Sequence, residues 1–583
     1  MIFNLMNRQH ILAILFICLL LLGTNSQATT KYVNVNNPTP SSPYTTWATA
    51  ATNIQTAVDS AFAGDLILVT NGVYQIGGRA AYGMSNRVAV TSPMTLLSVN
   101  GPAVTTIAGK TVFGTTTGFT AMRCVYLTNG AVLSGFTLTN GATQSSGDAL
   151  HVQVGGGVWC ESSSAMVSNC IITGNFAQSG GGGAYSGTLN NCTLSGNKAQ
   201  YGAGAESGTL SNCTLTGNSA QYGGGANAGT LTNCTLSGNK ASDSGGGTYF
   251  ATLNNCILSG NSAYYGGGAK SGTLSNCTFN SNLGYYGGGV EGSTLINCTL
   301  SSNLATNGGG TYLGTLTNCT LTGNSASYGG GTLDGLLINC TLTGNSASTN
   351  GGGVYFSEGY DVSLNNCILY YNSAPTNANF NPSRLRYLSY CCAMPLPPNG
   401  EGNFTNAPLF VNQAGGDLHL QANSPCINSG LNTYVQGATD LDSNPRIRGG
   451  TVDVGAYEFP NPTSVISYAW LQQFGLSIDG STDFTDADID GRNNWQEWVS
   501  GTNPTDANSS LRVLTLTTGY YGITVGWNSV ARRNYYLERA TDLSSPSPFQ
   551  LVKSNLFGQA GMTFYTDTGA TNSGPFFYRV GIQ

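Results

Sequence analysis

Between residues 160 and 375, apolar and polar positions alternate over very short stretches that end in glycine or asparagine. In the stretch NCTLTGNSAQYGGG, residues 212–225, a threonine separates Cys213 and Leu215, which is the spacing of a strand with one buried face. Glycine and asparagine bound these stretches because both tolerate the left-handed backbone of tight turns. No segment here has the length or spacing of an amphipathic helix. The pattern therefore predicts two or three very short strands per unit.

These short strands belong to a repeat with a fixed period. Cysteine recurs every 21 or 22 residues, with one longer final step, and an asparagine stands directly before it and another five residues after it. The cysteines of this series are Cys170, Cys192, Cys213, Cys234, Cys256, Cys277, Cys298, Cys319, Cys340 and Cys367. Self-similarity at a period of roughly 20–50 residues indicates a stacked architecture. A unit of this length built from short strands predicts one coil of a right-handed parallel β-helix, an all-β solenoid.

Equivalent residues of neighbouring coils should form columns spaced about 4.8 Å apart. Cysteine, leucine and alanine are expected to fill the inside of the coils. Stacked cysteines that point the same way have poor dihedral geometry for a bridge, so we expect a column of reduced, buried thiols rather than disulfides. At the turns, each asparagine side chain is expected to bond to the asparagine of the next coil.

The segment before the repeat predicts an export signal and a cap. Residues 1–28 contain Arg8, an apolar run over 11–22 and the sequence SQA, which is the pattern of a secretory signal peptide. The apolar run is shorter than the ~20 residues that span a bilayer. Residues 54–63 predict a capping helix, and residues 64–75 the first full coil. The mature chain is therefore predicted to lack a transmembrane helix and to be secreted or associated with the cell surface, outer membrane or cell envelope.

Three stretches of the chain resemble known families. The opening KYVNVNN … NIQTAVDSAFAGDLILVTNGVY resembles the start of right-handed parallel β-helix proteins of the pectin-lyase-like superfamily. The GN-x-A-x-x-GGG and N-C-T-[LF]-x-x-N repeats are similar to those of polymorphic outer-membrane proteins, which are adhesins. Residues 417–459, which include GTVDVGAYEF, resemble the closing module of secreted bacterial β-helix proteins. The resemblance implies this fold, and it leaves function open because the superfamily holds both enzymes and adhesins.

Composition narrows the classes of partner. Only 8% of residues are charged and the net charge is -6, so the chain has no basic surface for nucleic acid. A hydrophobic content of 40% argues against a charged disordered chain. The surface is expected to consist mainly of serine, threonine, asparagine and glycine.

Composition changes after Pro460. Residues 464–474 predict a short helix, and the stretch DADIDGRNNWQE over 486–497 matches an EF-hand-like calcium loop with glycine at the sharp turn. The predicted ligands are the side chains of Asp486, Asp488, Asp490, Asn494 and Glu497 and the backbone carbonyl of Arg492. We expect a structural calcium ion at this loop; a polar linker is the alternative. Six alternating runs after residue 511 predict a small β-sandwich.

The strongest rival function is a polysaccharide lyase or hydrolase on the same fold. Such enzymes need clustered carboxylates, either as an acid and base pair or as metal ligands beside a basic residue. Residues 161–374 contain seven acids and three lysines, with no arginine or histidine. The acids are Glu161, Glu206, Asp243, Glu291, Asp334, Glu358 and Asp361, and the lysines are Lys198, Lys240 and Lys270. These nearly neutral coils predict a poor catalytic face, and no catalytic residue is assigned.

Two other groups of ionisable residues lie outside the repeats. A hydrolytic or eliminative site in the early coils would draw on Arg79, Arg87, Arg123, Asp148 and His151, which are otherwise ordinary polar groups of turns. Near the closing segment stand Asp440, Asp442, Arg446, Asp453 and Glu458. We expect this second group to pin the closing segment through an arginine–carboxylate pair.

One repeated side chain is a candidate for binding. A tyrosine stands nine residues after the cysteine in several units, at Tyr201, Tyr222, Tyr265, Tyr286 and Tyr328. At ~4.8 Å per coil these residues would form a broken stripe along one edge. Tyrosine has a flat apolar face and a polar tip, which suits contact with sugar rings. The alternative is that these rings only cover the glycine turns of neighbouring coils.

The sequence thus predicts four parts. They are a signal peptide (1–28), a right-handed parallel β-helix (29–459) with a closing module from about 376, a calcium-loop connector (460–508) and a C-terminal β-sandwich (509–583). The predicted function is that of a non-enzymatic, adhesin-like protein that binds an extracellular glycan or a cell-surface or matrix component. The alternative is a carbohydrate-active enzyme, a polysaccharide lyase or glycoside hydrolase.

Overall fold

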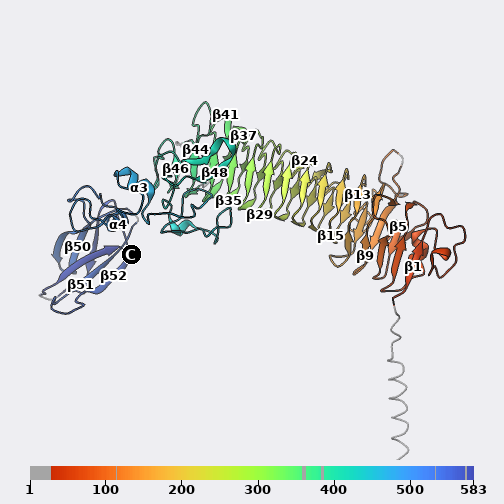
Figure 1. Cartoon of the computed structure of the whole chain (residues 1–583), viewed down its shortest axis with the longest axis horizontal. Helices are drawn as coiled ribbons and strands as arrows, with labels where there is room; N and C mark the ends of the chain where they lie inside the picture. The colour runs from red at the N-terminus through yellow and green to blue at the C-terminus, as the bar shows by residue number, and fades with distance from the viewer. Residues whose placement is uncertain are drawn as a thin grey trace, which may run out of the picture. The chain divides into compact units, whose positions relative to one another are not determined.

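The computed structural model describes residues 28–112, 114–357, 363–381, 387–531, 533–571 and 574–582. The predicted signal peptide lies outside these residues except for its last position. The chain divides into two units, residues 1–257 and 258–583. Strands of successive coils lie side by side within each unit (Figure 1). No helix among the described residues is long and apolar enough to cross a membrane.

The chain forms three long parallel sheets of 15, 14 and 13 strands, which confirms the right-handed parallel β-helix. The first sheet contains, in order, β1 (Thr30–Val33), β2 (Leu66–Val69), β6 (Thr95–Ser98), β9 (Val132–Ser134), β12 (Met166–Ser168), β15 (Thr188–Asn190), β18 (Thr209–Ser211), β22 (Thr230–Thr232), β26 (Thr252–Asn254), β29 (Thr273–Ser275), β32 (Thr294–Ile296), β35 (Thr315–Thr317), β39 (Leu336–Ile338), β43 (Ser363–Asn365) and β45 (Tyr387–Ser389). The second contains β3 (Gly72–Tyr74), β7 (Thr105–Ala108), β10 (Thr137–Thr139), β13 (Ile171–Thr173), β16 (Thr193–Ser195), β19 (Thr214–Thr216), β23 (Thr235–Ser237), β27 (Ile257–Ser259), β30 (Thr278–Asn280), β33 (Thr299–Ser301), β36 (Thr320–Thr322), β40 (Thr341–Thr343), β44 (Ile368–Tyr370) and β46 (Cys392–Ala393).

The third sheet lies on the side of the glycine runs. Its strands are β4 (Arg79–Ala81), β5 (Met84–Val90), β8 (Arg123–Leu127), β11 (Val158–Cys160), β14 (Ala184–Tyr185), β17 (Ala205–Glu206), β21 (Ala226–Asn227), β25 (Thr248–Tyr249), β28 (Ala269–Lys270), β31 (Val290–Glu291), β34 (Thr311–Tyr312), β38 (Thr332–Leu333) and β42 (Val354–Tyr355). Short extra pairs join β20 (Ser219–Tyr222) to β24 (Lys240–Ser244) and β37 (Ser325–Tyr328) to β41 (Ser346–Asn350). Most strands contain only two or three residues, because each coil must turn three times within one short unit.

Identical residues stack in register inside the coils. In the second sheet, Leu194 pairs with Leu215 and Leu215 with Leu236, and all three are fully buried. No disulfide joins the cysteines of the described residues, and every one of their side chains is buried. Cys213 Sγ donates to the Ser211 carbonyl oxygen at 3.3 Å. The predicted column of reduced thiols is therefore present.

Buried asparagines form the second internal column. In the first unit, Asn197 Nδ2 and backbone N both donate to Asn218 Oδ1, at 3.0 Å each. Asn218 makes the same pair of bonds to Asn239 Oδ1. The same side chain also bonds to the preceding coil, because Asn218 Nδ2 donates to the Leu194 carbonyl oxygen at 2.9 Å. Each amide therefore satisfies turn groups that the strands leave open, as the sequence predicts.

The glycine runs allow neighbouring turns to approach closely. A Cβ added at Gly225 would lie 2.6 Å from the Gly247 carbonyl oxygen, and one at Gly204 would lie 2.4 Å from the Gly225 carbonyl oxygen. Gly223 also has a φ of +64°, where other residues are strained. The stretch over residues 212–225 is thus a structural unit of the solenoid rather than a phosphate-binding loop.

The N-terminal end carries a cap. Helix α2 (Ile54–Asp59) begins after Asn53, whose side chain accepts a bond from Thr56 N at 2.9 Å. The helix is shorter than the predicted range, and it contacts β1, β2 and β5. A short 3-10 helix, η1 (Trp47–Thr49), precedes it. The first coil follows in β2 and β3, within the predicted residues.

The second unit contains the closing module, the connector and the C-terminal domain. The closing module includes β47 (Phe410–Asn412), η3 (Gln413–Gly415), β48 (Asp417–Leu420) and η4 (Asn432–Tyr434). The connector contains α3 (Tyr468–Gln473) and α4 (Asn494–Ser500). Two antiparallel sheets form the predicted sandwich, one from β49 (Val513–Gly519), β50 (Gly522–Ser529) and β53 (Gly561–Asp567), the other from β52 (Gln550–Phe557), β51 (Asn534–Ala540) and β54 (Phe577–Ile582). Its core includes Trp527 and Tyr535, both fully buried.

Candidate functional site

The aspartates of the predicted calcium loop lie together. One carboxylate oxygen from each of Asp486, Asp488 and Asp490 lies within 4.8 Å of the other two. Backbone amides shape the loop, because Ile489 N donates to Asp486 Oδ1 at 2.7 Å and Gly491 N to Asp486 Oδ2 at 2.8 Å. The φ of Gly491 is +90°, so glycine fits the sharp turn that the sequence predicts.

Helix α4, which begins at Asn494, carries two more oxygen atoms of the predicted ligand set. Asn494 and Glu497 are fully buried, yet Asn494 Oδ1 and Glu497 Oε2 have no hydrogen-bond partner. Asp488 Oδ2 and Asp490 Oδ2 are also buried without a partner. Buried oxygen atoms without donors are unfavourable unless a cation or water satisfies them. An all-oxygen donor set of this kind fits a hard cation such as Ca²⁺.

The carboxyl groups of the loop shift one another's pKa values. Burial, together with Asp488, raises the pKa of Glu497 to about 7. Burial and the neighbouring Asp490 also raise the pKa of Asp488. The remaining predicted ligand, Arg492, donates its backbone N to Asp490 Oδ1 at 2.7 Å, which holds its peptide at the loop. A bound divalent cation would neutralise this cluster and favour its ionised form.

The structure places the predicted tyrosines at equivalent positions of neighbouring coils. In the first unit, Tyr201 and Tyr222 form a parallel bridge. In the second unit, Tyr265 bridges Tyr286, and Asn307 connects Tyr286 to Tyr328. The broken stripe is therefore present within each unit, and its binding role stays a prediction.

A second column of aromatic residues, which the sequence reasoning missed, runs beside the stripe. It lies on the outer face of the third sheet, one residue after the inward-facing position of each strand, and includes Tyr249, Tyr312 and Tyr355. The rings of Tyr222 and Tyr249 lie 5.5 Å apart, and those of Tyr286 and Tyr312 5.1 Å apart. The signal in the sequence is the aromatic residue that follows two positions after several glycine runs.

Together these residues form two aromatic patches. The 201–249 patch consists of Tyr201, Tyr222 and Tyr249, and the 264–312 patch consists of Tyr264, Tyr265, Tyr285, Tyr286 and Tyr312. Tyr264 and Tyr285 are the most exposed members, at 44% and 41%. The doubled tyrosines at 264–265 and 285–286 widen the second patch.

The rings within each patch stack on one another. Tyr201 and Tyr222 are inclined by 14°, Tyr265 and Tyr286 by 11°, and Tyr264 and Tyr285 by only 3° at a centroid distance of 4.8 Å. Stacked rings cover each other's faces, so the patches present ring edges and hydroxyl groups to solvent. A sugar chain lying along a patch would therefore meet mainly hydrogen-bonding groups, and free ring faces only at the ends.

Few charged groups accompany the patches. Lys270 Nζ lies 4.1 Å from the Tyr265 ring centroid and 3.0 Å from Glu291 Oε2, with both side chains mostly covered. Beside the first patch, burial raises the pKa of Glu206 to about 7, and Asn227 Nδ2 donates to both of its oxygens at 3.0 Å. These acids are engaged with neighbours and do not form the pair of free carboxyl groups that glycoside hydrolysis uses.

The arginines of the early coils form structural hydrogen bonds and ion pairs. Arg123 is fully buried and donates to the carbonyl oxygens of Gly155, His151 and Val154 at 2.7–2.8 Å. Arg87 is also buried and donates to backbone carbonyls. Arg79 pairs with Asp59 at 2.9 Å on the surface. Arg123 therefore lies beside the backbone of His151, but all three guanidinium groups are bonded to backbone carbonyls or to Asp59.

Asp148 and His151 do come together, in an aromatic cluster. His151 Nδ1 lies 2.5 Å from Asp148 Oδ2, and Tyr82 stacks on the His151 ring at 5.0 Å. Tyr82 Oη donates to Glu161 Oε1 at 2.6 Å, and Trp159 lies 5.4 Å from His151. The sequence reasoning missed Tyr82 and Trp159, because no periodic pattern connects residues this far apart in the irregular coils.

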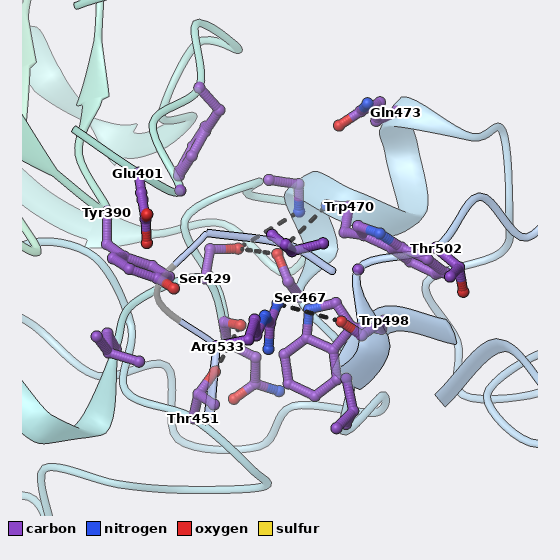
Figure 2. Close-up of a pocket in the computed structure, with 18 of the residues that line it drawn as sticks. Tyr390, Glu401, Ser429, Thr451, Ser467, Trp470, Gln473, Trp498, Thr502 and Arg533 are labelled. Atoms are coloured by element: carbon purple, nitrogen blue, oxygen red, sulfur yellow. Dashed lines mark hydrogen bonds between the residues drawn. The ribbon is translucent and has the colours of Figure 1, made fainter. Parts of the chain in front are cut away.

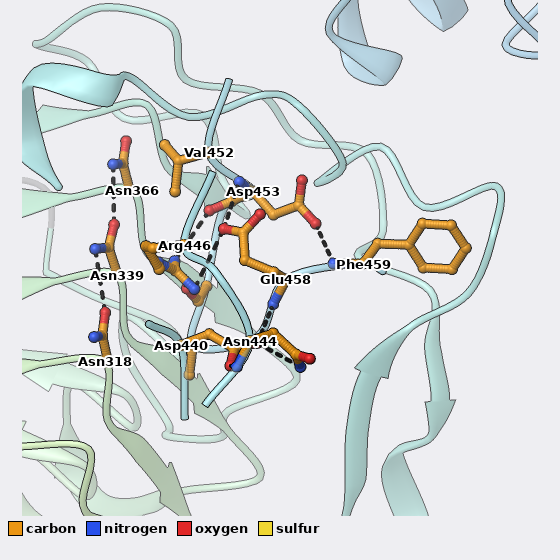
Figure 3. Close-up of polar contacts among 12 residues, drawn as sticks. Asn318, Asn339, Asn366, Asp440, Asn444, Arg446, Val452, Asp453, Glu458 and Phe459 are labelled. Atoms are coloured by element: carbon orange, nitrogen blue, oxygen red, sulfur yellow. Dashed lines mark hydrogen bonds and ion pairs between the residues drawn. The ribbon is translucent and has the colours of Figure 1, made fainter. Parts of the chain in front are cut away.

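The closing module is held by the predicted arginine–carboxylate contact (Figure 3). Arg446 Nη1 lies 3.4 Å from Glu458 Oε1, with both side chains buried. Arg446 Nη2 donates to the carbonyl oxygens of Asp453 and Gly455. Burial raises the pKa of Asp453 and of Glu458, and the neighbouring acids raise both further, while Arg446 opposes the increase. This group is therefore structural.

Asparagines of the last coils dock the closing module. Asn339 Nδ2 donates to Asn318 Oδ1 and Asn366 Nδ2 to Asn339 Oδ1, so the three side chains form the column seen in Figure 3. Asn318 Nδ2 also donates to the Thr439 carbonyl oxygen at 3.0 Å. Asp442, in contrast, contacts His419 at 2.5 Å rather than the arginine.

Comparisons with known proteins find only distant likenesses. No protein-family model matches this chain, and no curated protein matches its sequence. Among solved structures, pectate lyase Pel9A is 14% identical, with 74% of this chain and 97% of that chain covered and a TM-score of 0.27. The A-module of a mannuronan C-5 epimerase from Azotobacter vinelandii is 14% identical, with 61% and 95% covered and a TM-score of 0.31. The alginate lyase AlyGC of family PL6 is 12% identical, with 70% and 58% covered and a TM-score of 0.32. At these values the likenesses bear on no activity of this chain, and the fold rests on its own strand pairing.

Proposed function

We propose that this chain is an exported, non-enzymatic protein of the cell surface or extracellular space that binds glycan, in the manner of an adhesin. The observation that carries the proposal is the pair of tyrosine patches, in which two neighbouring columns of outward-facing rings recur at the coil spacing. Regularly spaced hydroxyl groups suit a ligand that is itself a repeating chain of hydroxyl groups. The charged side chains of the coils are engaged in structural contacts, so few groups remain for catalysis. An extracellular glycan, or a matrix component that carries one, is therefore the proposed partner.

We propose that the loop over residues 486–497 binds one structural calcium ion. The support is its set of buried oxygen atoms without donors, to which the aspartates and helix α4 both contribute. When bound, calcium supplies the positive charge that this cluster of acids lacks. The loop and α4 then fix the connector that precedes the sandwich. Export, which the N-terminal sequence supports, would place this site where calcium is abundant.

The proposal is tested by measuring retention of the purified chain on immobilised glycans while assaying the same glycans for turnover. The panel contains neutral β-glucans, mannan, xylan and chitin beside the acidic polymers alginate and polygalacturonate. We expect saturable retention on at least one glycan, without new reducing ends or the ultraviolet absorbance of unsaturated uronates. Robust turnover of any polymer, or no retention on all of them, would overturn the proposal.

The second candidate function is a hydrolytic or eliminative activity in the early coils. The observation that favours it is the Asp148–His151 pair stacked beside Tyr82, whose hydroxyl is bonded to Glu161. His151 would act as the base with Asp148 orienting its ring. The turnover assay decides between the two functions. If turnover is found, His151→Ala should abolish it, and Lys110→Ala, at an exposed position of the same region, should not.

A further inference from the structure

A large cavity lies within the second unit, and no tyrosine of the two patches lines it. Its volume is 1610 Å³, and it lies between the closing module, helices α3 and α4, and the start of the sandwich. Figure 2 shows Trp470 on α3, Trp498 on α4 and Arg533 of the sandwich around it. Tyr390, from the end of the coils, lines the opposite wall. Ligand pockets for drug-sized molecules usually measure about 300–1,000 Å³, so this cavity has room for a longer ligand.

The tryptophan rings of this cavity differ from the tyrosine rings of the patches, because no other aromatic ring of the described residues stacks on their faces. Trp495 and Trp498 line the cavity and have no aromatic partner among the described residues, while Trp470 meets only the edge of Phe474. Trp495 is 40% exposed, and Phe484 at the same cavity is 66% exposed. Indole faces without a stacked ring are surfaces on which the C–H groups of sugar rings can pack. Their N–H groups form no bond to another described residue and can donate to a ligand.

Polar groups surround these rings. Ser429 Oγ and Ser467 Oγ lie 2.7 Å apart, and Thr502 lines the cavity beside α4. The charged side chains among the described lining residues are Arg533 and Glu401, one of each sign. A lining that is aromatic, rich in hydroxyl and amide groups and balanced in charge favours an uncharged, hydroxyl-rich ligand over an acidic one. It also disfavours a long apolar peptide, which would bury these polar groups without partners.

We propose that this cavity binds a neutral polysaccharide segment of several sugar rings, stacked on Trp495 and Trp498, and that calcium in the neighbouring loop holds α4 in the binding position. This site is separate from the tyrosine patches. The calcium link rests on the calcium site proposed above.

The link follows from the two faces of α4. Asn494 and Glu497 carry the unpartnered oxygens of the predicted calcium ligands, whereas Trp495 and Trp498 line the cavity. Glu497 Oε1 accepts a bond from Thr502 Oγ1 at 3.2 Å, and Thr502 is itself a lining residue. A helix of this length is marginal by itself. Neutralising the acids beneath it therefore stabilises the helix that presents both indoles.

The test measures binding of neutral hexasaccharides to the full chain by calorimetry, with calcium and with EGTA. The probes are laminarihexaose, cellohexaose, mannohexaose and xylohexaose. We expect at least one to bind in calcium, with affinity reduced at least tenfold by Trp495→Ala or Trp498→Ala. The matched control is Trp47→Ala, because Trp47 is similarly exposed, at 42%, and lies in the N-terminal cap. Tyr264→Ala/Tyr285→Ala should leave this binding unchanged, which separates the cavity from the patches.

Calcium dependence is tested with the same probe. EGTA, or Glu497→Gln in calcium, should weaken binding at least tenfold, whereas Asp479→Asn, at an exposed acid outside the loop, should not. Thermal unfolding of each variant shows that the chain remains folded. No binding of any neutral probe in calcium, or equal affinity of the tryptophan variants, would overturn the cavity assignment. Preference for an alginate hexamer or a peptide would overturn the ligand class, and equal affinity in EGTA would overturn the calcium link.

Discussion

Removing one amide from the buried asparagine column should destabilise the coils far more than its size suggests. Asn303 is fully buried. Its Oδ1 accepts from both the N and the Nδ2 of Asn282 at 3.0 Å, and its Nδ2 donates to the Phe279 carbonyl oxygen at 3.0 Å and to Asn324 Oδ1 at 2.9 Å. Asn303→Ala removes all four of these bonds.

The magnitude follows from the groups that lose their partners. The Nδ2 of Asn282 keeps its bond to the Leu258 carbonyl oxygen, and Asn324 Oδ1 keeps the backbone N of residue 303. The backbone N of Asn282 loses its acceptor, and the Phe279 carbonyl loses a donor. Phe279 pairs with Leu300 in the ladder between β30 and β33, so its carbonyl stays in that ladder and only the backbone N of Asn282 is left without a partner. An unsatisfied buried group costs about 1–3 kcal/mol, so the substitution should cost about 1–3 kcal/mol of local stability.

Hydrogen exchange followed by mass spectrometry measures this effect coil by coil, since repeat proteins open locally. Exchange should accelerate in the coils around residues 279–324 and stay unchanged in the sandwich. Asn36→Ala is the control, because Asn36 is exposed and its side chain forms no bond to a described residue. A change below about 0.5 kcal/mol at the mutated coil, the range of ordinary surface substitutions, would refute the reasoning that the column satisfies the turns.

Three further predictions concern titration, thiols and the closing module. Without calcium, the raised pKa of Glu497 favours its protonated form, so this contribution to stability is present at low pH and is lost as pH rises through about 7. In EGTA the unfolding temperature should therefore fall between about pH 5 and pH 8, whereas in calcium it should not. Calorimetry should also detect proton release when calcium binds. The thiols of the coils should not react with Ellman's reagent until the chain unfolds, because burial shields them; fast labelling of the native chain would contradict this. Arg446→Met leaves Glu458 buried beside other acids without its cation and should cost about 3–5 kcal/mol of stability in the closing module. Denaturant unfolding measures this cost, with Arg448→Met, at a neighbouring position, as the control. An effect no larger than that of the control would show that the pair is not what holds the module.

The repetitive parts of the fold could be predicted from the sequence because each coil is packed against a near copy of itself. Once Cys213 and Leu215 face inward, the same positions of the next coil must do so, and the columns follow from the period. The small antiparallel sheets after residue 511 were also predictable, since their alternating runs are bounded by turns.

Contacts between irregular segments could not be predicted in this way. The bond from Asn318 to Thr439 and the contact of Tyr82 with Glu161 join residues far apart in sequence, and no periodicity relates them. The cavity of the second unit arises in the same manner, from loops and short helices of several segments. For the tyrosines, the sequence predicted the stacking position but not the stacking geometry, in which neighbouring rings cover each other's faces.

The central claim, that the chain binds glycan along its tyrosine patches, is tested most directly by one binding measurement. Tyr264→Ala/Tyr285→Ala removes the two most exposed rings of the 264–312 patch, and Tyr520→Ala/Tyr521→Ala removes two exposed tyrosines of the sandwich as a control. The affinity of each variant is compared with that of the unaltered chain on the polymer that the chain retains best. We expect the patch variant to bind at least tenfold more weakly and the control to bind normally. Equal affinity of the patch variant and the unaltered chain would contradict the claim.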